Sequence, residues 1–209
     1  MTYKELHDRV LQLINQYSIA GTTVASSYNN QADYEARIPA LANDGLDYIA
    51  TTARRLRTTA ELTGGDDYAA HWKIYALPDD FYSPAHAGVL TENQIGELYW
   101  DPRVRYIGRN HILVPKHVRE PVTIEYYRYP VHIQNELSPD GDQLIDLPNE
   151  AAAALPYYIA SHLVMADDAY IQATLYNEFE NKLSRLGEPI VTEQMPMLDV
   201  YDARWGEYL

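Results

Sequence analysis

One stretch of the sequence, VTIEYYRY at residues 122–129, decides how the middle of the chain folds. β-Branched and aromatic side chains fill it, and such side chains pack well on the pleated surface of a sheet. Shorter pieces of similar character precede it at residues 72–76, 106–107 and 111–114. Prolines fall at the ends of these runs, where a missing backbone N–H is tolerated. We therefore predict a small antiparallel sheet or barrel of roughly four to six strands between residues 71 and 133.

Two helical patterns precede this β region. Thr2 and Glu5 have the spacing of a capping box, in which each side chain accepts a hydrogen bond from the other residue's backbone N–H. Apolar residues then recur at helical spacing, at Leu6, Val10, Leu13 and Tyr17. A second helix is expected from about residue 31 to Arg57, with Pro39 either kinking it or marking its start. Gly45 lies within it, either because another helix crosses closely there or because the helix tolerates it.

Helical patterns return after the β region. Asp146 can cap a helix that runs from residue 149 to Met165, and Pro156 should bend this helix. Asp167 and Asp168 can cap another helix, which should end at about Gly187. The order is therefore two helices, a β segment, two helices and a tail.

This order predicts an α+β chain. It would be mainly an α-helical bundle of about four helices, interrupted by an inserted antiparallel β module and followed by an extended C-terminal arm. The expected segments are residues 1–62 for the N-terminal helices of the bundle, 63–146 for the inserted β module, 147–187 for the C-terminal helices and 188–209 for the arm. The helices can share one core only if a small set of apolar residues faces inward together: Leu6, Val10, Ile49, Leu163 and Leu175.

The composition excludes several classes of protein. The chain of 209 residues has 30 acidic residues against 16 lysines and arginines, a net charge of −14, which argues against a general nucleic-acid coat. Cysteine is absent, and this excludes disulfides, thiolate metal sites and cysteine nucleophiles. The 19 tyrosines fit either a surface that becomes buried on assembly or simply a strand-rich chain.

We expect neither a signal peptide nor a membrane partner. Residues 1–5 lack the basic stretch and apolar run of a secretory signal. The longest apolar stretch, residues 151–166, falls short of the roughly 18 apolar residues that a membrane span needs. It should be a buried core helix instead.

The strands carry a local excess of positive charge. Six basic residues stand against Asp101, Glu120 and Glu125 between residues 101 and 130, a balance of +3 in an acidic chain. The predicted basic surface of the β module consists of Arg103, Arg105, Arg109, Lys116, Arg119 and Arg128. These charges either deter aggregation at strand edges or form a positive face for an acidic neighbour or for DNA in a channel.

The tail combines acidic residues with many apolar ones. Glu193, Asp199, Asp202 and Glu207 stand against Arg204 alone after residue 189. A segment this apolar should either fold back onto its own core or dock onto a partner. The residues that would anchor such a partner-binding arm are Met195, Met197, Leu198, Val200, Tyr201, Trp205, Tyr208 and Leu209.

No motif points to an enzyme. The seven histidines are dispersed without metal-ligand spacing, and neither nucleotide-binding loops nor a nucleophile elbow occur. We therefore predict no catalytic residue, no metal and no cofactor. The alternative is an unrecognised site built from His111 or His117 near Glu125 on adjacent strands.

Several segments resemble a known family. The runs DYEARIPALAN at residues 33–43, DLPNE at 146–150, LPYYIA at 155–160 with the pair Asp167-Asp168, and YNEFENKL at 176–183 are similar to segments of the head-to-tail connector (adaptor) proteins of tailed bacteriophages. These pieces cover both helical halves, roughly half of the chain, in the order that the family has. The β insertion and the tail depart from its pattern.

The resemblance implies a structural virion protein rather than an enzyme. It implies a ring of roughly twelve copies that docks on the portal protein, extends the DNA channel without sequence-specific binding and holds the next neck or tail protein. Its place would be the virion neck, reached from the host cytoplasm during assembly, with the arm on the portal or on a neighbouring copy. The alternative is a tail-completion or tail-terminator protein.

Overall fold

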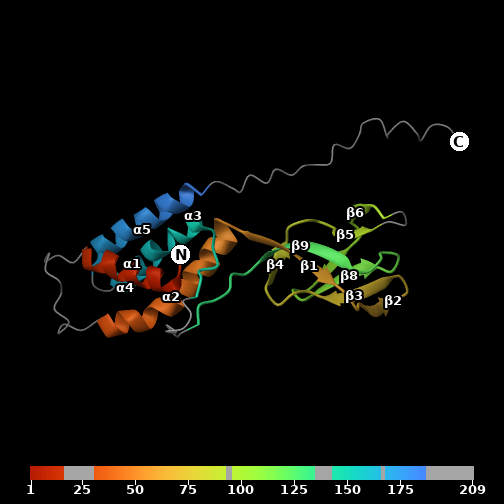
Figure 1. The fold of residues 1–209 in the computed structure, drawn as a ribbon, viewed down its shortest axis with the longest axis horizontal. Coiled ribbons are helices and arrows are strands. Elements are labelled where there is room, and N and C mark those ends of the chain that lie inside the picture. Colours follow the sequence, from red (N-terminus) through yellow and green to blue (C-terminus); the bar gives the residue numbers. More distant parts are fainter. Residues whose placement is uncertain (17–30, 93–95, 135–142, 166–167, 187–209) are drawn as a thin grey trace, which may run out of the picture.

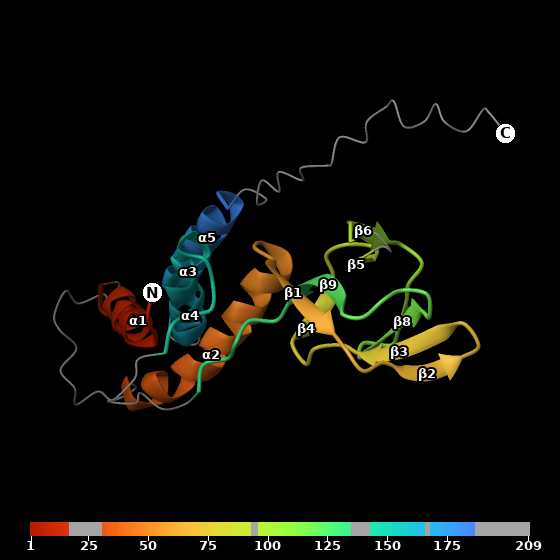
Figure 2. The same ribbon diagram turned by 45° about the vertical axis from the view of Figure 1, so that its right-hand side comes forward.

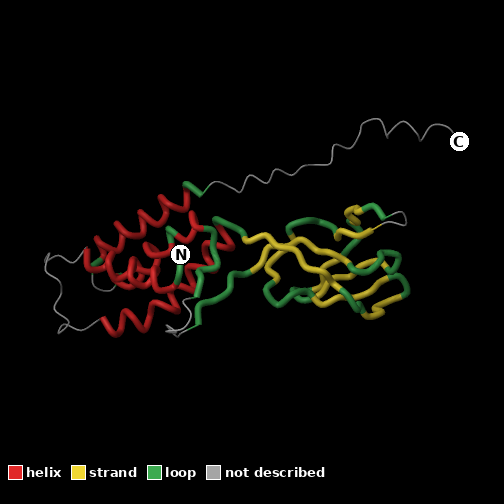
Figure 3. The backbone as a smooth tube through the Cα atoms, in the orientation of Figure 1, coloured by secondary structure: helices red, strands yellow, loops and turns green. Residues whose placement is uncertain are grey.

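The structure is a computed structural model, and it describes residues 1–16, 31–92, 96–134, 143–165 and 168–186. Its helices lie together at one end and its strands at the other (Figure 1). The turned view keeps this separation (Figure 2), and the backbone coloured by secondary structure shows it directly (Figure 3). The chain therefore has a helical part and a β part, each with its own cluster of buried apolar residues.

The helical part combines segments from before and after the strands. Its helices are α1 (Tyr3–Gln16), α2 (Gln31–Thr52), α3 (Asn149–Ala152), α4 (Leu155–Val164) and α5 (Ala169–Ser184). α4 is mostly buried and contacts α1, α2 and α5. The residues predicted to face inward are all buried in one cluster: Leu6, Val10, Ile49, Leu163 and Leu175. That part of the prediction is confirmed.

Local sequence signals set two of the helix starts as predicted. The Thr2 N–H donates to Glu5 Oε2 at 3.0 Å and the Glu5 N–H donates to Thr2 Oγ1 at 3.2 Å, which is the capping box. Asp168 Oδ1 accepts hydrogen bonds from the Tyr170 and Ile171 N–H groups at 2.9 and 3.0 Å. Both caps satisfy backbone donors that a helix start leaves unpaired.

Gly45 marks the crossing of α2 with α4. A Cβ atom at this position would lie 2.6 Å from Leu155 Cδ1 and 2.8 Å from Tyr158 Cδ1. Both distances are shorter than van der Waals contact, so a side chain there would push against α4. The close-crossing interpretation of this glycine is therefore confirmed.

The β part contains two antiparallel sheets. Its strands are β1 (Leu56–Leu62), β2 (Asp66–Ala69), β3 (Trp72–Ala76), β4 (Phe81–Pro84), β5 (Val89–Glu92), β6 (Leu98–Asp101), β7 (Arg105–Ile107), β8 (His111–Pro115) and β9 (Val122–Arg128). One sheet has the order β1-β9-β5-β6, with β4 also paired to β9, and the other has the order β2-β3-β8-β7. Residues of both sheets share one buried apolar cluster.

β9 is the strand on which the first sheet is built. It pairs with β1 from Leu56↔Arg128 to Leu62↔Val122, and it also pairs with β4 and β5. Val122, Ile124 and Tyr126 are buried while the residues between them are partly exposed. The strand predicted from VTIEYYRY is therefore confirmed, as are those at residues 72–76, 106–107 and 111–114.

The predicted fold class, mainly a helical bundle with an inserted β module, is wrong. The described residues form nine strands in two antiparallel sheets with their own core, so the chain is rich in β structure. The predicted number of strands was too low because β2, β4, β5 and β6 are only four residues long. Such short strands carry too few residues to establish a period.

The predicted helix boundaries also need correction. The second helix ends at Thr52 instead of Arg57, because Leu56 and Arg57 already pair with β9. Pro39 lies inside α2 and does not mark its start. The single helix expected from residue 149 is two, α3 and α4, with Pro156 in the first turn of α4. The predicted end at Gly187 lies outside the described residues.

The crossing at Gly45 generates a stability prediction. Gly45→Ala should lower the free energy of unfolding by about 1–3 kcal/mol, because α4 has to shift away from the new methyl group. Helix propensity alone would act in the opposite direction by about 1 kcal/mol. Urea unfolding followed by circular dichroism measures the change. The control is Ala36→Gly at an exposed position of α2, which reports propensity alone, and a stabilising Gly45→Ala would contradict the close crossing.

Candidate functional site

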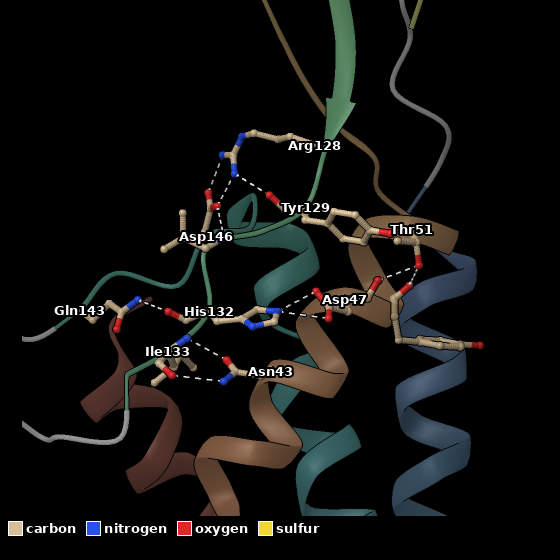
Figure 4. A network of polar contacts seen from close by, with 11 residues as sticks. Asn43, Asp47, Thr51, Arg128, Tyr129, His132, Ile133, Gln143 and Asp146 are labelled. Carbon is tan, nitrogen blue, oxygen red and sulfur yellow. Dashed lines mark hydrogen bonds and ion pairs between the residues drawn. The ribbon is translucent and has the colours of Figure 1, made fainter. Parts of the chain in front are cut away.

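The helical and β parts meet at a polar junction, formed by residues 128–133 and 143–146 together with α2 (Figure 4). Arg128, the last residue of β9, donates from its two terminal nitrogens to Asp146 Oδ2 and Oδ1, the latter at 2.8 Å. The Val131 N–H donates to Asp146 Oδ2 at 2.7 Å. The hydrogen bonds from Arg128 lower the pKa of Asp146, and burial opposes them. One carboxylate therefore ties the end of β9 to the segment that precedes α3.

A second set of contacts fastens the same segment to α2. The Ile133 N–H donates to Asn43 Oδ1 at 2.7 Å, and Asn43 Nδ2 donates to the Ile133 carbonyl at 3.1 Å. The Asn43 amide thereby completes the backbone pairing of Ile133 in the way a neighbouring strand would. One turn further along α2, Asp47 Oδ1 lies 3.0 Å from His132 Nε2. Gln143 Nε2 donates to the His132 carbonyl at 2.9 Å and closes the network from the other side.

The other connection between the parts, residues 53–55, is also held by side chains. Arg54 lies 3.9 Å from the Glu150 carboxylate of α3. The Arg55 guanidinium lies over the Tyr127 ring of β9, 5.3 Å from its centroid. Arg57 then pairs with Glu125 across the β1–β9 ladder, with Nη2 2.6 Å from Oε2. Side-chain contacts therefore hold both connections at the boundary between the helical part and the β part.

Sequence reasoning missed most of this junction. Asp146 was predicted to cap a helix, but its side chain binds Arg128 and Val131 instead, and Pro148 stands at the start of α3. Asn43 and Asp47 carry no sequence signal that sets them apart from other polar residues of α2. Their partners lie 90 and 85 positions away, so no local pattern could have revealed them.

The predicted basic residues of the β module do not lie in equivalent environments. Arg128 belongs to the junction, and Lys116 forms an ion pair with Asp67 at 2.9 Å. Arg109 is exposed in a turn and Arg119 in the irregular segment before β9, and the described part of the chain supplies no ion-pair partner for either. Arg103 and Arg105 lie together at the rim of a groove.

This groove, called here the β groove, lies beside the start of β3 and the end of β8 and has a volume of about 560 Å³. Its lining residues are His71, Trp72, Pro102, Arg103, Val104, Arg105, Pro115 and His117. The Arg105 guanidinium lies over the Trp72 ring, 5.3 Å from its centroid. The groove therefore combines an aromatic and proline-lined wall with cationic side chains.

A buried carboxylate orients Arg103. Asp101 is fully buried, and the Arg103 Nε and Nη2 groups donate to its two oxygens at 3.0 and 2.8 Å. These hydrogen bonds lower the pKa of Asp101 to about 2, although burial opposes the shift. His117 Nε2 lies 3.2 Å from Asp101 Oδ2 and 2.9 Å from Arg103 Nη2. Asp101 therefore lies beneath the surface, and the Arg103 side chain that it holds stays 64% exposed.

The histidines proposed for an enzyme site are not brought together with Glu125. His117 has Asp101 as its carboxylate neighbour, and Glu125 pairs with Arg57 on the other sheet. His111 is exposed at the start of β8. Within the described ranges, no three His, Asp or Glu residues lie close enough to hold a metal ion. In the same ranges, no helix has the length and apolar character to cross a membrane.

The predicted partner-binding arm, with its anchors from Met195 to Leu209, lies outside the described residues. Its role stays a prediction.

The structure thus consists of two separately packed parts joined at a polar junction. In the comparison with protein families, the model of the SU10 adaptor protein family matches residues 1–200. The chain belongs to this family of phage head–tail adaptors, which confirms the resemblance drawn from its helical segments. It is a structural adaptor of the virion neck that interacts with other head or tail proteins. The search of curated proteins gave no match.

Removal of the Asp146 carboxylate should destabilise the junction. Asp146→Ala should lower the free energy of unfolding by about 1–3 kcal/mol, because Arg128 and the Val131 N–H both lose their acceptor. In a double-mutant cycle with Arg128→Leu, the two losses should not add, since either change removes the pair. Denaturant unfolding of the four proteins measures this. Additive losses would show that Asp146 and Arg128 act independently.

The Asp101–Arg103 pair generates a pH prediction. The pKa of Asp101 is about 2 in the folded chain, against about 4 when unfolded. The carboxylate therefore adds stability above about pH 4 and loses that contribution as the pH falls through about 2. Asp101→Asn should be less stable than the wild type at neutral pH, and the gap should shrink between about pH 4 and pH 2. Asp79→Asn, at an exposed turn position, is the control, and a gap that does not change with pH would refute the prediction.

Proposed function

We propose that this adaptor docks on the portal as a ring, extends the DNA channel and presents the attachment face for the next neck or tail component. Membership in the adaptor family supports the proposal. The observation that carries it is the division into a helical part and a β part with separate cores. Two parts that keep their shape independently can each contact a different neighbour in an assembly.

A ring of roughly twelve copies requires a heterologous contact, in which one face of a subunit binds a different face of the next. Such a contact closes only if the two faces keep a fixed angle. The junction supports this, because paired side chains hold both connections between the parts. A net charge of −14 should keep the free subunit soluble and away from DNA until it reaches the portal.

The charges of the β part support a channel through which DNA slides without sequence-specific binding. Arg103, Lys116 and Arg128 are already paired with carboxylates of the same chain. A paired cation has little gain from releasing counterions on a phosphate backbone. We place the subunit in the host cytoplasm before assembly and assign it no catalytic role and no cofactor. The arm, residues 188–209, would bind the portal or a neighbouring copy.

Mixing the purified chain with portal rings tests the proposal. Electron microscopy should show an added ring at one end of the portal. Sedimentation should show that no free chain is left below a fixed molar ratio of chain to portal. A parallel experiment mixes the chain with tail-tube protein instead of portal. Binding to the tail tube and not to the portal would replace the connector by a tail-completion protein.

Removal of the arm generates a separate prediction. A chain that lacks residues 196–209 should still fold, because the buried apolar clusters of the described residues are formed before residue 187. It should fail to join the portal, since it has lost its apolar anchors. Circular dichroism and co-sedimentation with portal measure the two properties. Normal assembly of the shortened chain would show that the arm is dispensable.

A further inference from the structure

The β groove has a definite chemical character. Trp72, Pro102, Val104 and Pro115 supply apolar wall, and Arg105 supplies a positive charge. Arg103 adds an exposed guanidinium that is paired with Asp101. Asp101 is fully buried beneath Arg103, so the surface presents the guanidinium and hides the carboxylate. Trp72 holds the Arg105 guanidinium over its ring and so restricts its position. A ligand that suits this site is an acidic peptide with at least one aromatic side chain.

The chain itself contains such a peptide. After residue 187, five acidic residues stand against Arg204, and Tyr201, Trp205 and Tyr208 are spread among them. This segment, the arm at residues 188–209, therefore has the opposite charge to the groove and the aromatic side chains that its wall can hold.

The arm has a long reach from the end of α5. The described structure ends at Leu186 after α5, and the 18 residues from 187 to 204 can span about 60 Å when extended. That is nearly twice the length of α2, whose 22 residues measure about 33 Å. A tether of this length gives the arm a local concentration near the millimolar range, well above the concentration of other copies in a dilute solution.

We propose that in the free subunit the β groove binds the chain's own C-terminal arm. The contact covers the apolar anchors of the arm and neutralises Arg105, so that neither is available to other copies. It goes beyond the adaptor function, because it concerns the single subunit before a portal is present. Docking on a partner that binds the arm more tightly would vacate the groove.

The arm provides its own reporter for a test, because Arg204 is the only trypsin site after residue 187. Cleavage there removes residues 205–209, and mass spectrometry of the full chain follows this loss. In the wild type, cleavage at Arg204 should be at least about tenfold slower than in the free synthetic peptide of residues 188–209. The rate should rise with salt, because the contact is partly electrostatic, and should not change on dilution, because it lies within one chain.

Variants in the groove and in the arm distinguish a specific contact between them from a general loss of stability. Arg105→Glu should raise the cleavage rate toward that of the free peptide, and Arg105→Lys should keep most of the protection. Arg109→Glu makes the same change in charge at an exposed turn outside the groove and should leave the rate unchanged. The arm variant Asp199→Asn/Asp202→Asn leaves the β part untouched and should also raise the rate.

Three results would overturn the proposal. They are equal cleavage of Arg105→Glu and the wild type, equal acceleration by Arg109→Glu, and a rate in the wild type equal to that of the free peptide. A rate that increases on dilution would assign the arm to another copy instead. Because the assay contains no portal, its outcome is independent of whether the chain forms a ring there.

Discussion

The pairing of Arg128 with Asp146 is the interaction on which the arrangement of the two parts depends. Arg128 ends the central strand of the first sheet, and Asp146 lies just before the helices resume. The same carboxylate also accepts the Val131 N–H. A hydrophobic contact could have joined the parts as firmly but would have allowed them to slide. Directed hydrogen bonds fix an angle, because their strength depends on geometry.

The sequence predicts what its local patterns encode and little else. Buried and partly exposed residues alternate in β9, and its sequence at residues 122–129 correctly predicted a strand. The spacing of Thr2 and Glu5 correctly predicted a helix start. The first two residues of β1, Leu56 and Arg57, were assigned to the end of a helix because both are strong helix formers, and their pairing with β9 makes them part of a strand. The junction depends on partners such as Asn43 and Ile133, which are 90 positions apart. No pattern within a single element could have indicated it.

The ion pairs in the structure show which basic residues of the β part keep an available charge. The excess of basic residues between 101 and 130 looks like one positive surface in the sequence. In the structure, carboxylates of the same chain pair with Arg103, Lys116 and Arg128. The positive charge that stays available is divided among Arg105 in the groove, Arg109 in a turn and Arg119 in an irregular segment. Local geometry, more than composition, therefore decides which cations can meet a partner.

The pairing of Leu56 with Arg128 has a consequence for how such chains can evolve. These residues are the first of β1 and the last of β9, so the polypeptide enters and leaves the β part at neighbouring points. A domain whose two ends lie side by side can be exchanged for another without moving the scaffold that receives it. The β part can thus change while the helices keep their arrangement.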